Sequence, residues 1–264
     1  MIEDKLAQFD LLETRPVSTP LMPNQAVQPD PHHKRGKENL EDPAVQHQRA
    51  QDSQSLKKEE HDRYMSIVGS LQYLAIVTRP DIAFAASALA RYMNNPTRFL
   101  LKCAERTLRY LGHTKDLTLT YSGDRKGSNK AMLLGYSDAD YAGCTVTARS
   151  TSGMVITFQG LPIYWRSKRQ PIVTVSTAES ELVALTEAAL ETQWLKMLLE
   201  EDFHIDVESK LLCDNRATTR IAEDPICSNK TRHILVRYKK AQEYVDEKKT
   251  KVEGISTSRQ RQTR

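Results

Sequence analysis

Apolar residues recur every three or four positions from Tyr64 to Leu111, which is the spacing of amphipathic helices. Two proline-containing segments, residues 79–81 and 94–97, interrupt this pattern, because proline disfavours a helical conformation in the residue before it. The pattern therefore predicts three short helices. Alternating residues then predict a strand at Leu117–Tyr121, and the helical region is taken as residues 64–121.

A different pattern begins near Met132. Three short apolar runs separated by turns predict an antiparallel meander of strands. These strands are expected at Met132–Asp138, Gly153–Phe158 and Leu161–Arg166. A long helix is expected from Ser176 to about Phe203, because Ser176 and Glu179 have the spacing of a capping box. Two further strands and two further helices are expected at residues 210–214, 251–256, 217–223 and 233–247.

Residues 15–63 differ in composition from both patterned regions. Six prolines lie there among glutamines, acids and lysines, with few large apolar residues. Such a segment cannot bury enough surface to offset its ordering entropy. Apart from a short helix within residues 1–12, we expect residues 1–63 to be a flexible linker. The basic tail, residues 257–264, has no pattern and is expected to be disordered.

The overall composition limits the possible functions. The 264 residues are 39% hydrophobic and 27% charged, enough for one large or two small domains. The net charge of +4 permits a polyanionic partner without requiring one. The four cysteines form no C-x-x-C pair, which indicates a reducing intracellular compartment rather than a zinc site or a disulfide framework. No apolar run is long enough to span a membrane, and the N-terminus has no signal-peptide pattern.

Three acids are notable for their positions on these elements. Asp138 ends the first strand of the meander, Glu181 lies in the first turn of the long helix, and Asp214 ends the fourth strand. Aspartate is a poor strand former, and a helix start favours an anion. Like charges brought together are costly unless a cation neutralises them, and carboxylates suit Mg²⁺ or Mn²⁺. Two such ions about 4 Å apart are a known device for the attack of water on a phosphodiester.

A row of cations lies on the third predicted helix. The row consists of Arg98, Lys102, Arg106 and Arg109. Their spacing of four, four and three residues puts them on one helix face. Such a face is either solvated or follows phosphates. Glu105 is the single acid between Arg91 and Lys115, which favours the phosphate interpretation.

Longer motifs give the chain a family resemblance. They include Gly-Tyr-Ser-Asp-Ala-Asp-Tyr-Ala-Gly at residues 135–143 and the segments at residues 149–153, 165–170, 176–181 and 213–215. These motifs resemble the ribonuclease H (RNase H) domain of Ty1/copia-type retrotransposon Pol polyproteins. Upstream, residues 16–21, 64–74 and 78–83 resemble the end of the reverse transcriptase of the same polyproteins, its thumb-like region.

The resemblance implies an α/β (α+β) fold, with an RNase H-like mixed five-stranded sheet and flanking helices over residues 132–256. It implies that Asp138, Glu181 and Asp214 are catalytic acids that hold two Mg²⁺ or Mn²⁺ ions. The substrate would be the RNA strand of an RNA–DNA hybrid, or another nucleic acid. The remaining reverse transcriptase domain is a further expected partner, and a membrane is not. The expected location is cytoplasmic or nuclear, in retroelement particles where the element is active.

An RNase H must sense the 2′-hydroxyl group to distinguish RNA from DNA. We expect Ser137 and Asn215 near that group. Further contacts with nucleic acid are expected from Trp165, Lys168, Arg169 and Gln170, although a tryptophan at a strand end is more often part of the core.

The chain also departs from the family pattern. The paired aspartates of the polymerase palm are absent, so no reverse transcriptase activity is expected. The family continues after its last strand with a helix bearing a fourth acid, whereas this chain has Ser-Thr-Ser-Arg-Gln-Arg at residues 256–261. The family also tends to show His-Ile-Asp where this chain has His-Ile-Leu at residues 233–235. We therefore expect a degraded or truncated copy whose fold survives better than its activity.

Two residues and two rival functions stay open. Asp140 is either a turn residue or a neighbour of the metal site, and His233 is either structural or part of the site. A non-catalytic nucleic-acid-binding remnant would bind a hybrid without cleaving it. An inert relic would bind neither a hybrid nor Mg²⁺.

Overall fold

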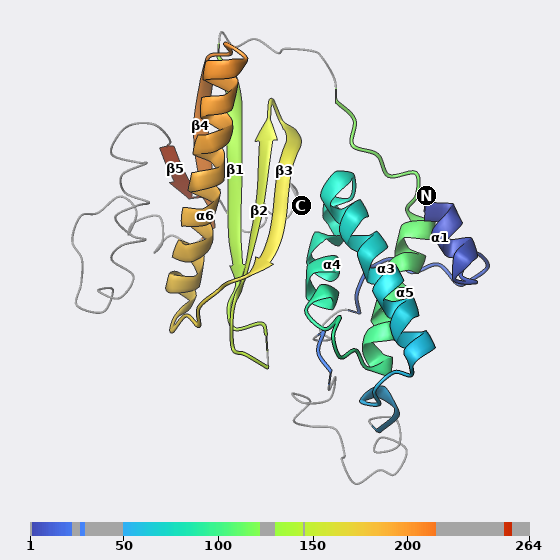
Figure 1. Ribbon diagram of the computed structural model, residues 1–264. Coiled ribbons are helices and arrows are strands. Elements are labelled where there is room, and N and C mark those ends of the chain that lie inside the picture. The colour runs from blue at the N-terminus through green and yellow to red at the C-terminus, as the bar shows by residue number, and fades with distance from the viewer. Residues whose placement is uncertain are drawn as a thin grey trace. The chain divides into compact units, whose positions relative to one another are not determined.

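The structure is a computed structural model of residues 1–264 (Figure 1). It describes residues 2–22, 27–29, 50–121, 130–144, 146–214 and 251–254, the last of these by their backbone alone. The chain divides into two compact units, Met1–Thr118 and Leu119–Arg264. Each unit is described by itself.

The first unit is helical. Its elements are α1 (Ile2–Gln8), α3 (Lys58–Val77), the short 3₁₀ helix η1 (Pro80–Ile82), α4 (Ala83–Ala90) and α5 (Arg98–His113). The breaks at Pro80 and Pro96 fall where the sequence predicts them. Helix α3 begins at Lys58 rather than Tyr64, and the Glu60 carboxylate accepts a hydrogen bond from the Lys57 backbone N–H at 3.2 Å. Side-chain capping therefore extends the helix into a polar stretch that has no apolar periodicity.

The core of this unit lies between α3, α4 and α5. The apolar face of α3, which includes Tyr64, Ile67 and Leu71, packs against Leu100 and Leu108 of α5. The buried Tyr64 hydroxyl donates to a backbone carbonyl of α4 at 2.7 Å, so its polar atom is satisfied inside the core.

The described parts of the expected linker also pack on this core. Val17, Leu21, Val27 and Leu56 are partly buried against it. The expectation of a flexible segment is therefore wrong for these positions, because scattered apolar residues still find a helical surface to cover. Residues 23–26 and 30–49 lie outside the described part.

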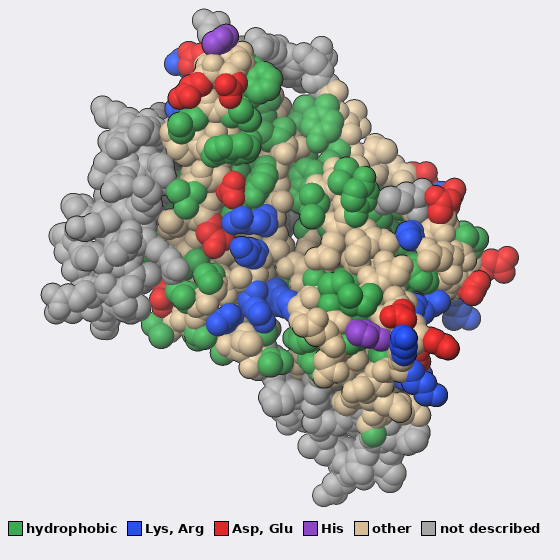
Figure 2. All heavy atoms as spheres, in the orientation of Figure 1, with side chains coloured by type: hydrophobic (Ala, Val, Ile, Leu, Met, Phe, Trp, Pro, Cys, Tyr) green, Lys and Arg blue, Asp and Glu red, His purple; other side chains and the backbone are tan. Residues whose placement is uncertain are grey.

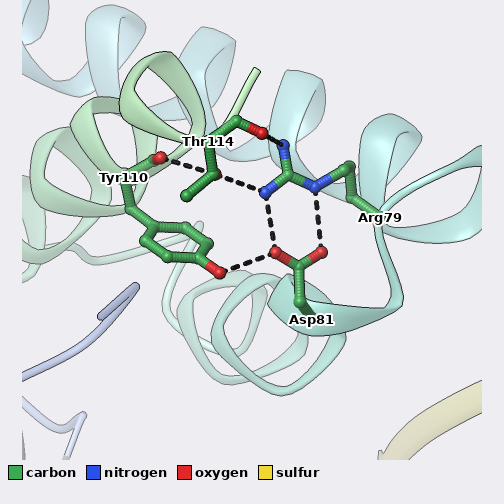
Figure 3. Close-up of polar contacts among 4 residues, drawn as sticks. All are labelled: Arg79, Asp81, Tyr110 and Thr114. Atoms are coloured by element: carbon green, nitrogen blue, oxygen red, sulfur yellow. Dashed lines mark hydrogen bonds and ion pairs between the residues drawn. The ribbon is translucent and has the colours of Figure 1, made fainter. Parts of the chain in front are cut away.

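Four residues form a polar cluster that ties η1 to the end of α5 (Figure 3). The buried Arg79 guanidinium donates to both Asp81 carboxylate oxygens, at 2.9 and 2.7 Å, and to the Thr114 carbonyl and hydroxyl. The Tyr110 hydroxyl donates to the same carboxylate at 2.9 Å. Burial favours the neutral acid, but the hydrogen bonds from Arg79 and Tyr110 outweigh it and hold the pKa of Asp81 below its usual value.

The second unit is a five-stranded sheet with a long helix. Its elements are β1 (Ala131–Asp140), β2 (Thr151–Phe158), β3 (Leu161–Arg169), α6 (Thr177–Met197), which continues as the π-helical η2 (Leu198–Asp202), β4 (Val207–Cys213) and β5 (Lys251–Gly254). The strand order is β3-β2-β1-β4-β5. The pairs β1–β2 and β2–β3 are antiparallel, whereas β4 runs parallel to both β1 and β5. This mixed sheet confirms the expected RNase H-like fold class.

One predicted strand is absent. Residues 117–121 form no strand, and the side chains of Leu117 and Tyr121 are exposed. Alternation alone does not make a strand, because a strand also needs a neighbour for its backbone hydrogen bonds. The helices expected at residues 217–223 and 233–247 and the tail at 257–264 lie outside the described part.

Helix α6 covers one face of the sheet along β1 and β4 (Figure 1). The alternate residues of β1 from Ala131 to Ser137 are buried on the α6 side. At Gly135 the helix comes so close that a Cβ atom would lie 2.7 Å from both Thr192 Oγ1 and Leu211 Cδ2. A glycine is therefore required there for the helix to lie at this depth. No helix among residues that the structure describes is both long and apolar enough to cross a membrane.

The Arg79 cluster generates a test of the first unit. Arg79→Met leaves the Asp81 carboxylate, whose side chain is 25% exposed, without its ion-pair partner. We expect a loss of about 3 kcal/mol in the free energy of unfolding, measured by urea denaturation at pH 7.

The same cluster predicts a pH dependence. Because the pKa of folded Asp81 is depressed, its stabilising effect is present above the unfolded-state pKa of about 3.9 and is lost as the pH falls through the folded-state pKa. The difference in unfolding free energy between wild type and Arg79→Met should therefore shrink in that acid range. Tyr110→Phe, which removes one hydrogen bond, is the milder control at about 1 kcal/mol. Equal urea midpoints for wild type and Arg79→Met would show that the ion pair does not stabilise this unit.

Candidate metal site at the ends of β1 and β4

The three predicted acids lie on elements that meet at one end of the sheet. Ser137 of β1 and Cys213 of β4 are partners in the parallel ladder. The next residues along the two strands, Asp138 and Asp214, therefore stand beside one another at adjacent strand ends. The second turn of α6, which carries Glu181, packs against this end of the sheet.

The start of α6 explains why Glu179 and Glu181 have different roles. The Ser176 hydroxyl accepts a hydrogen bond from the Glu179 backbone N–H at 3.1 Å, and the Glu179 carboxylate accepts one from the Val175 N–H at 2.7 Å. This confirms the predicted N-cap, with the returning bond shifted by one residue. Glu179 is thus used by the helix start. Glu181 lies in the second turn rather than the first and is 7% exposed.

The closest group of potential metal ligands differs from the expected one. One ligand atom each of Glu181, Cys213 and Asp214 lie within 4.8 Å of one another. Among the residues that the structure describes, Asp138 belongs to no such group. The structure therefore brings two of the three predicted acids together and adds a thiol that the sequence analysis did not consider.

Strand alternation explains the position of Asp138. Side chains of successive strand residues point to opposite faces of a sheet. Ser137 is buried on the face that α6 covers, so Asp138 belongs to the opposite face, where it is half-buried. Ser137 is for the same reason unable to reach a substrate, and the expectation that it senses the 2′-hydroxyl group is wrong.

The donor set fits a hard divalent cation in part. Two carboxylates at this spacing suit Mg²⁺ or Mn²⁺, which prefer oxygen ligands. The Cys213 thiol is a softer ligand, and it is fully buried against Leu185 and Ala188 of α6. Cys213 therefore belongs to the core, and the two carboxylates are the candidate ligands. Cys213 reads in the sequence as one more buried residue of an apolar strand, so no sequence pattern indicates that it lies beside the two carboxylates.

The remaining acid of the first motif, Asp140, is the last residue of β1. Asp140 is exposed, and a Cβ atom at Gly143 would overlap its carboxylate. The Asp140 side chain thus folds back over the turn that follows β1. Two further predicted site residues, Asn215 and His233, lie outside the described residues.

The cation row on α5 is largely matched by residues of its own unit. Arg98 pairs with Glu60 and Lys102 with Asp52, each at 2.9 Å. Arg106 donates to the Thr19 hydroxyl at 2.9 Å, whereas Arg109 is half-buried. Glu60, Asp52 and Thr19 all lie in the segment expected to be a linker. These contacts favour a structural role for the row, and its contact with phosphates stays a prediction.

Strand β3 presents basic side chains beside α6. Figure 2 shows Lys and Arg side chains gathered over β3 next to acidic side chains of α6. Arg166 accounts for part of this group, since it forms ion pairs with Glu187 at 3.3 Å and Glu191 at 3.1 Å. Lys168 is exposed, and Arg169 lies within 3.8 Å of the Cys144 sulfur atom.

The other two predicted contacts of this strand differ in accessibility. Trp165 is half-buried and pairs with Val155, which in turn pairs with Tyr136, so it lies on the same face as Asp138. Gln170 is 2% exposed and donates to Ser152 and to the Ser180 carbonyl. The expectation that Gln170 touches nucleic acid is therefore wrong.

Sequence comparisons relate the chain to larger proteins. No protein-family model matches it. It is 37% identical over 195 residues, 74% of its length, to the retrovirus-related Pol polyprotein from transposon TNT 1-94 of Nicotiana tabacum. It is 32% identical over 257 residues, 97% of its length, to the retrovirus-related Pol polyprotein from transposon RE1 of Arabidopsis thaliana. The chain spans only 14% and 16% of these relatives.

A structural comparison gives a weaker likeness. A crystal structure of LC11-RNase H1 in complex with an RNA/DNA hybrid is similar over 48% of this chain and 87% of that chain, with a TM-score of 0.38 and 17% identity. The fold assignment therefore rests on the strand order and directions of the sheet itself.

The contacts of the basic residues predict different roles for two lysines. Lys102→Ala should lower the free energy of unfolding by about 0.5 kcal/mol, because it removes the ion pair with Asp52, and should leave the salt dependence of hybrid binding unchanged. Lys168→Ala should leave stability unchanged and reduce the slope of log affinity against log salt by about one. Urea denaturation and fluorescence anisotropy at several salt concentrations measure both effects. A reduced salt slope for Lys102→Ala would restore the phosphate-binding interpretation of the α5 row.

Proposed function

We propose that this chain, which belongs to the retrovirus-related Pol polyproteins of Ty1/copia-type transposons, carries an RNase H module that hydrolyses the RNA strand of an RNA–DNA hybrid. The observation that carries the proposal is the approach of the Glu181 and Asp214 carboxylates at the end of β4, directly beside the strand end that carries Asp138.

In this proposal Asp138, Glu181 and Asp214 hold two Mg²⁺ or Mn²⁺ ions. When bound, such ions would lower the pKa of a water molecule for attack and would offset the charge on the leaving oxygen. The protein contributes fixed positions: Glu181 on a helix whose start is capped, and the two aspartates at the ends of neighbouring parallel strands. Fixed carboxylates lower the entropy cost of assembling the site.

The surface beside Asp138 suits a polyanion. Asp138 pairs with Gly153, and Gly153 pairs with Ser167, so the row across β2 and β3 next to the acid carries small residues. Trp165 on the same face offers a flat apolar surface to a sugar or base, and Arg169, whose ladder partner Thr151 pairs with Asp140, offers a charge on that face to a phosphate. A reverse transcriptase domain is the proposed partner that would deliver the hybrid.

We further propose that turnover is low. The ten residues that follow β5, residues 255–264, contain no aspartate or glutamate, whereas the family pattern has a fourth acid there. With one fewer carboxylate, a second ion is held less tightly.

The rival proposal is a module that binds nucleic acid without cleaving it. The exclusion of Asp138 from the closest ligand group favours this candidate. Salt-dependent binding of the hybrid without cleavage would support it.

The purified chain, incubated with a labelled RNA–DNA hybrid, tests these proposals. We expect slow cleavage of the RNA strand, faster in Mn²⁺ than in Mg²⁺, and loss of cleavage to background in Asp138→Asn. Asp140→Asn, which changes the exposed acid at the end of the same strand, is the matched control and should cleave at the wild-type rate. Unchanged cleavage by Asp138→Asn would contradict the assigned site, and equally rapid cleavage in both metals would contradict the low turnover.

A further inference from the structure

Gln170 occupies an unusual position for a residue of a basic strand end. It follows β3 directly and is 2% exposed. Its side-chain Nε2 donates two hydrogen bonds, to the Ser152 hydroxyl at 3.0 Å and to the Ser180 carbonyl at 2.9 Å. Its backbone N–H donates to the Ser150 carbonyl at 2.8 Å. Burying an amide group raises the free energy of the folded state unless hydrogen-bond partners replace the water that it loses.

The two side-chain partners of Gln170 belong to the elements that carry the acids. Ser180 immediately precedes Glu181 in α6, so the amide holds the helix turn from which the Glu181 side chain extends. Ser152 lies in β2 and pairs with Ala139, the residue after Asp138 in β1. One amide group therefore connects the turn of Glu181 to the strand pair beside Asp138.

A second buried contact reinforces the same connection. The hydroxyls of Ser150 and Thr174 lie 2.9 Å apart, and the Ser150 hydroxyl accepts from the Ala142 backbone N–H at 3.1 Å. Ser150 and Thr174 are both buried. This links the turn after β1 to the segment that leads into α6. The polar network thus spans the carboxyl end of β1 and the amino end of α6, the two places that carry Asp138 and Glu181.

We propose that Gln170 is a positioning residue that fixes the α6 turn of Glu181 relative to the paired strands β1 and β2 and thereby sets the affinity of the site for a divalent cation. The inference rests on the proposed metal site, although not on turnover. A residue that served packing alone could be replaced by an apolar side chain of similar volume without an effect on the ion. A residue that orients a ligand could not, because removing such partners typically lowers metal affinity about 10- to 100-fold.

Calorimetric titration of the full chain with Mn²⁺, without nucleic acid, tests this role. Gln170→Met keeps the volume and removes the amide, and we expect the Kd for Mn²⁺ to rise about tenfold or more. Gln193→Met is the control, because it replaces a half-buried glutamine further along α6 in the same way. Its Kd for Mn²⁺ should equal that of wild type. Gln170→Asn keeps an amide that is too short to reach both acceptors, and it should also bind more weakly. If Gln170→Met does not fold, the Kd of Gln170→Asn for Mn²⁺ tests the proposal instead.

A cleavage assay separates positioning from a general loss of structure. For a positioning residue, the Mn²⁺ concentration that gives half-maximal cleavage rises, while the rate at saturating Mn²⁺ stays near that of wild type. Wild-type affinity for Mn²⁺ in folded Gln170→Met or Gln170→Asn would overturn the inference. Wild-type protein that binds Mn²⁺ but cleaves no hybrid would overturn only the proposed hydrolysis. Wild-type protein that binds no Mn²⁺ would overturn both.

Discussion

The close packing of α6 against β1 is the constraint on which the second unit depends. At Gly135 the helix approaches so near that a single Cβ atom would collide with side chains of both α6 and β4. This depth fixes which residues of the two strands become core, and it fixes how far the first turns of α6 reach over the sheet end. A side chain at position 135 would therefore require Thr192 of α6 and Leu211 of β4 to shift.

Polar groups at the start of α6 add hydrogen bonds to that packing, and together they define the position of the Glu181 carboxylate. Glu179 is used to cap the helix, and Gln170 holds the next turn from the side of β2 and β3. These groups are buried, so each hydrogen bond is made at the expense of contacts with water, and losing one partner is costly. Such networks define a single geometry better than apolar contacts do, because they are directional. The placement of Glu181 is in this sense specified twice, once by packing and once by hydrogen bonds.

In the first unit, the charges have a different task. Arg79 and Asp81 are joined in a bidentate pair within a cluster that also holds Tyr110 and Thr114. On α5, two cations of the predicted phosphate-binding row are matched by acids, Glu60 and Asp52, that precede them by many residues in the chain. Counting charges along one helix cannot reveal such partners. Two of the four cations on α5 are thus paired with acids from outside the helix.

The sequence by itself determined the properties that depend on neighbouring residues. Proline placed the helix breaks, the spacing of Ser176 and Glu179 placed the start of α6, and short apolar runs separated by turns placed the strands of the meander. It also placed Asp138 and Asp214 near the ends of their strands and Glu181 near the start of its helix. Local patterns suffice for this because turns, caps and amphipathic periods are set within a few residues.

Only the tertiary structure decided what each residue faces. The face of β1 that α6 covers leaves Asp138 on the other side and buries Ser137, and the residues 117–121 form no strand for want of a pairing neighbour among the described strands. Gln170 changed from an expected contact with nucleic acid to a buried connection between elements, and Cys213 joined the two carboxylates. These outcomes depend on contacts between residues that are distant in the chain. Such contacts are selected by packing and hydrogen bonding over the whole unit, so no local pattern encodes them.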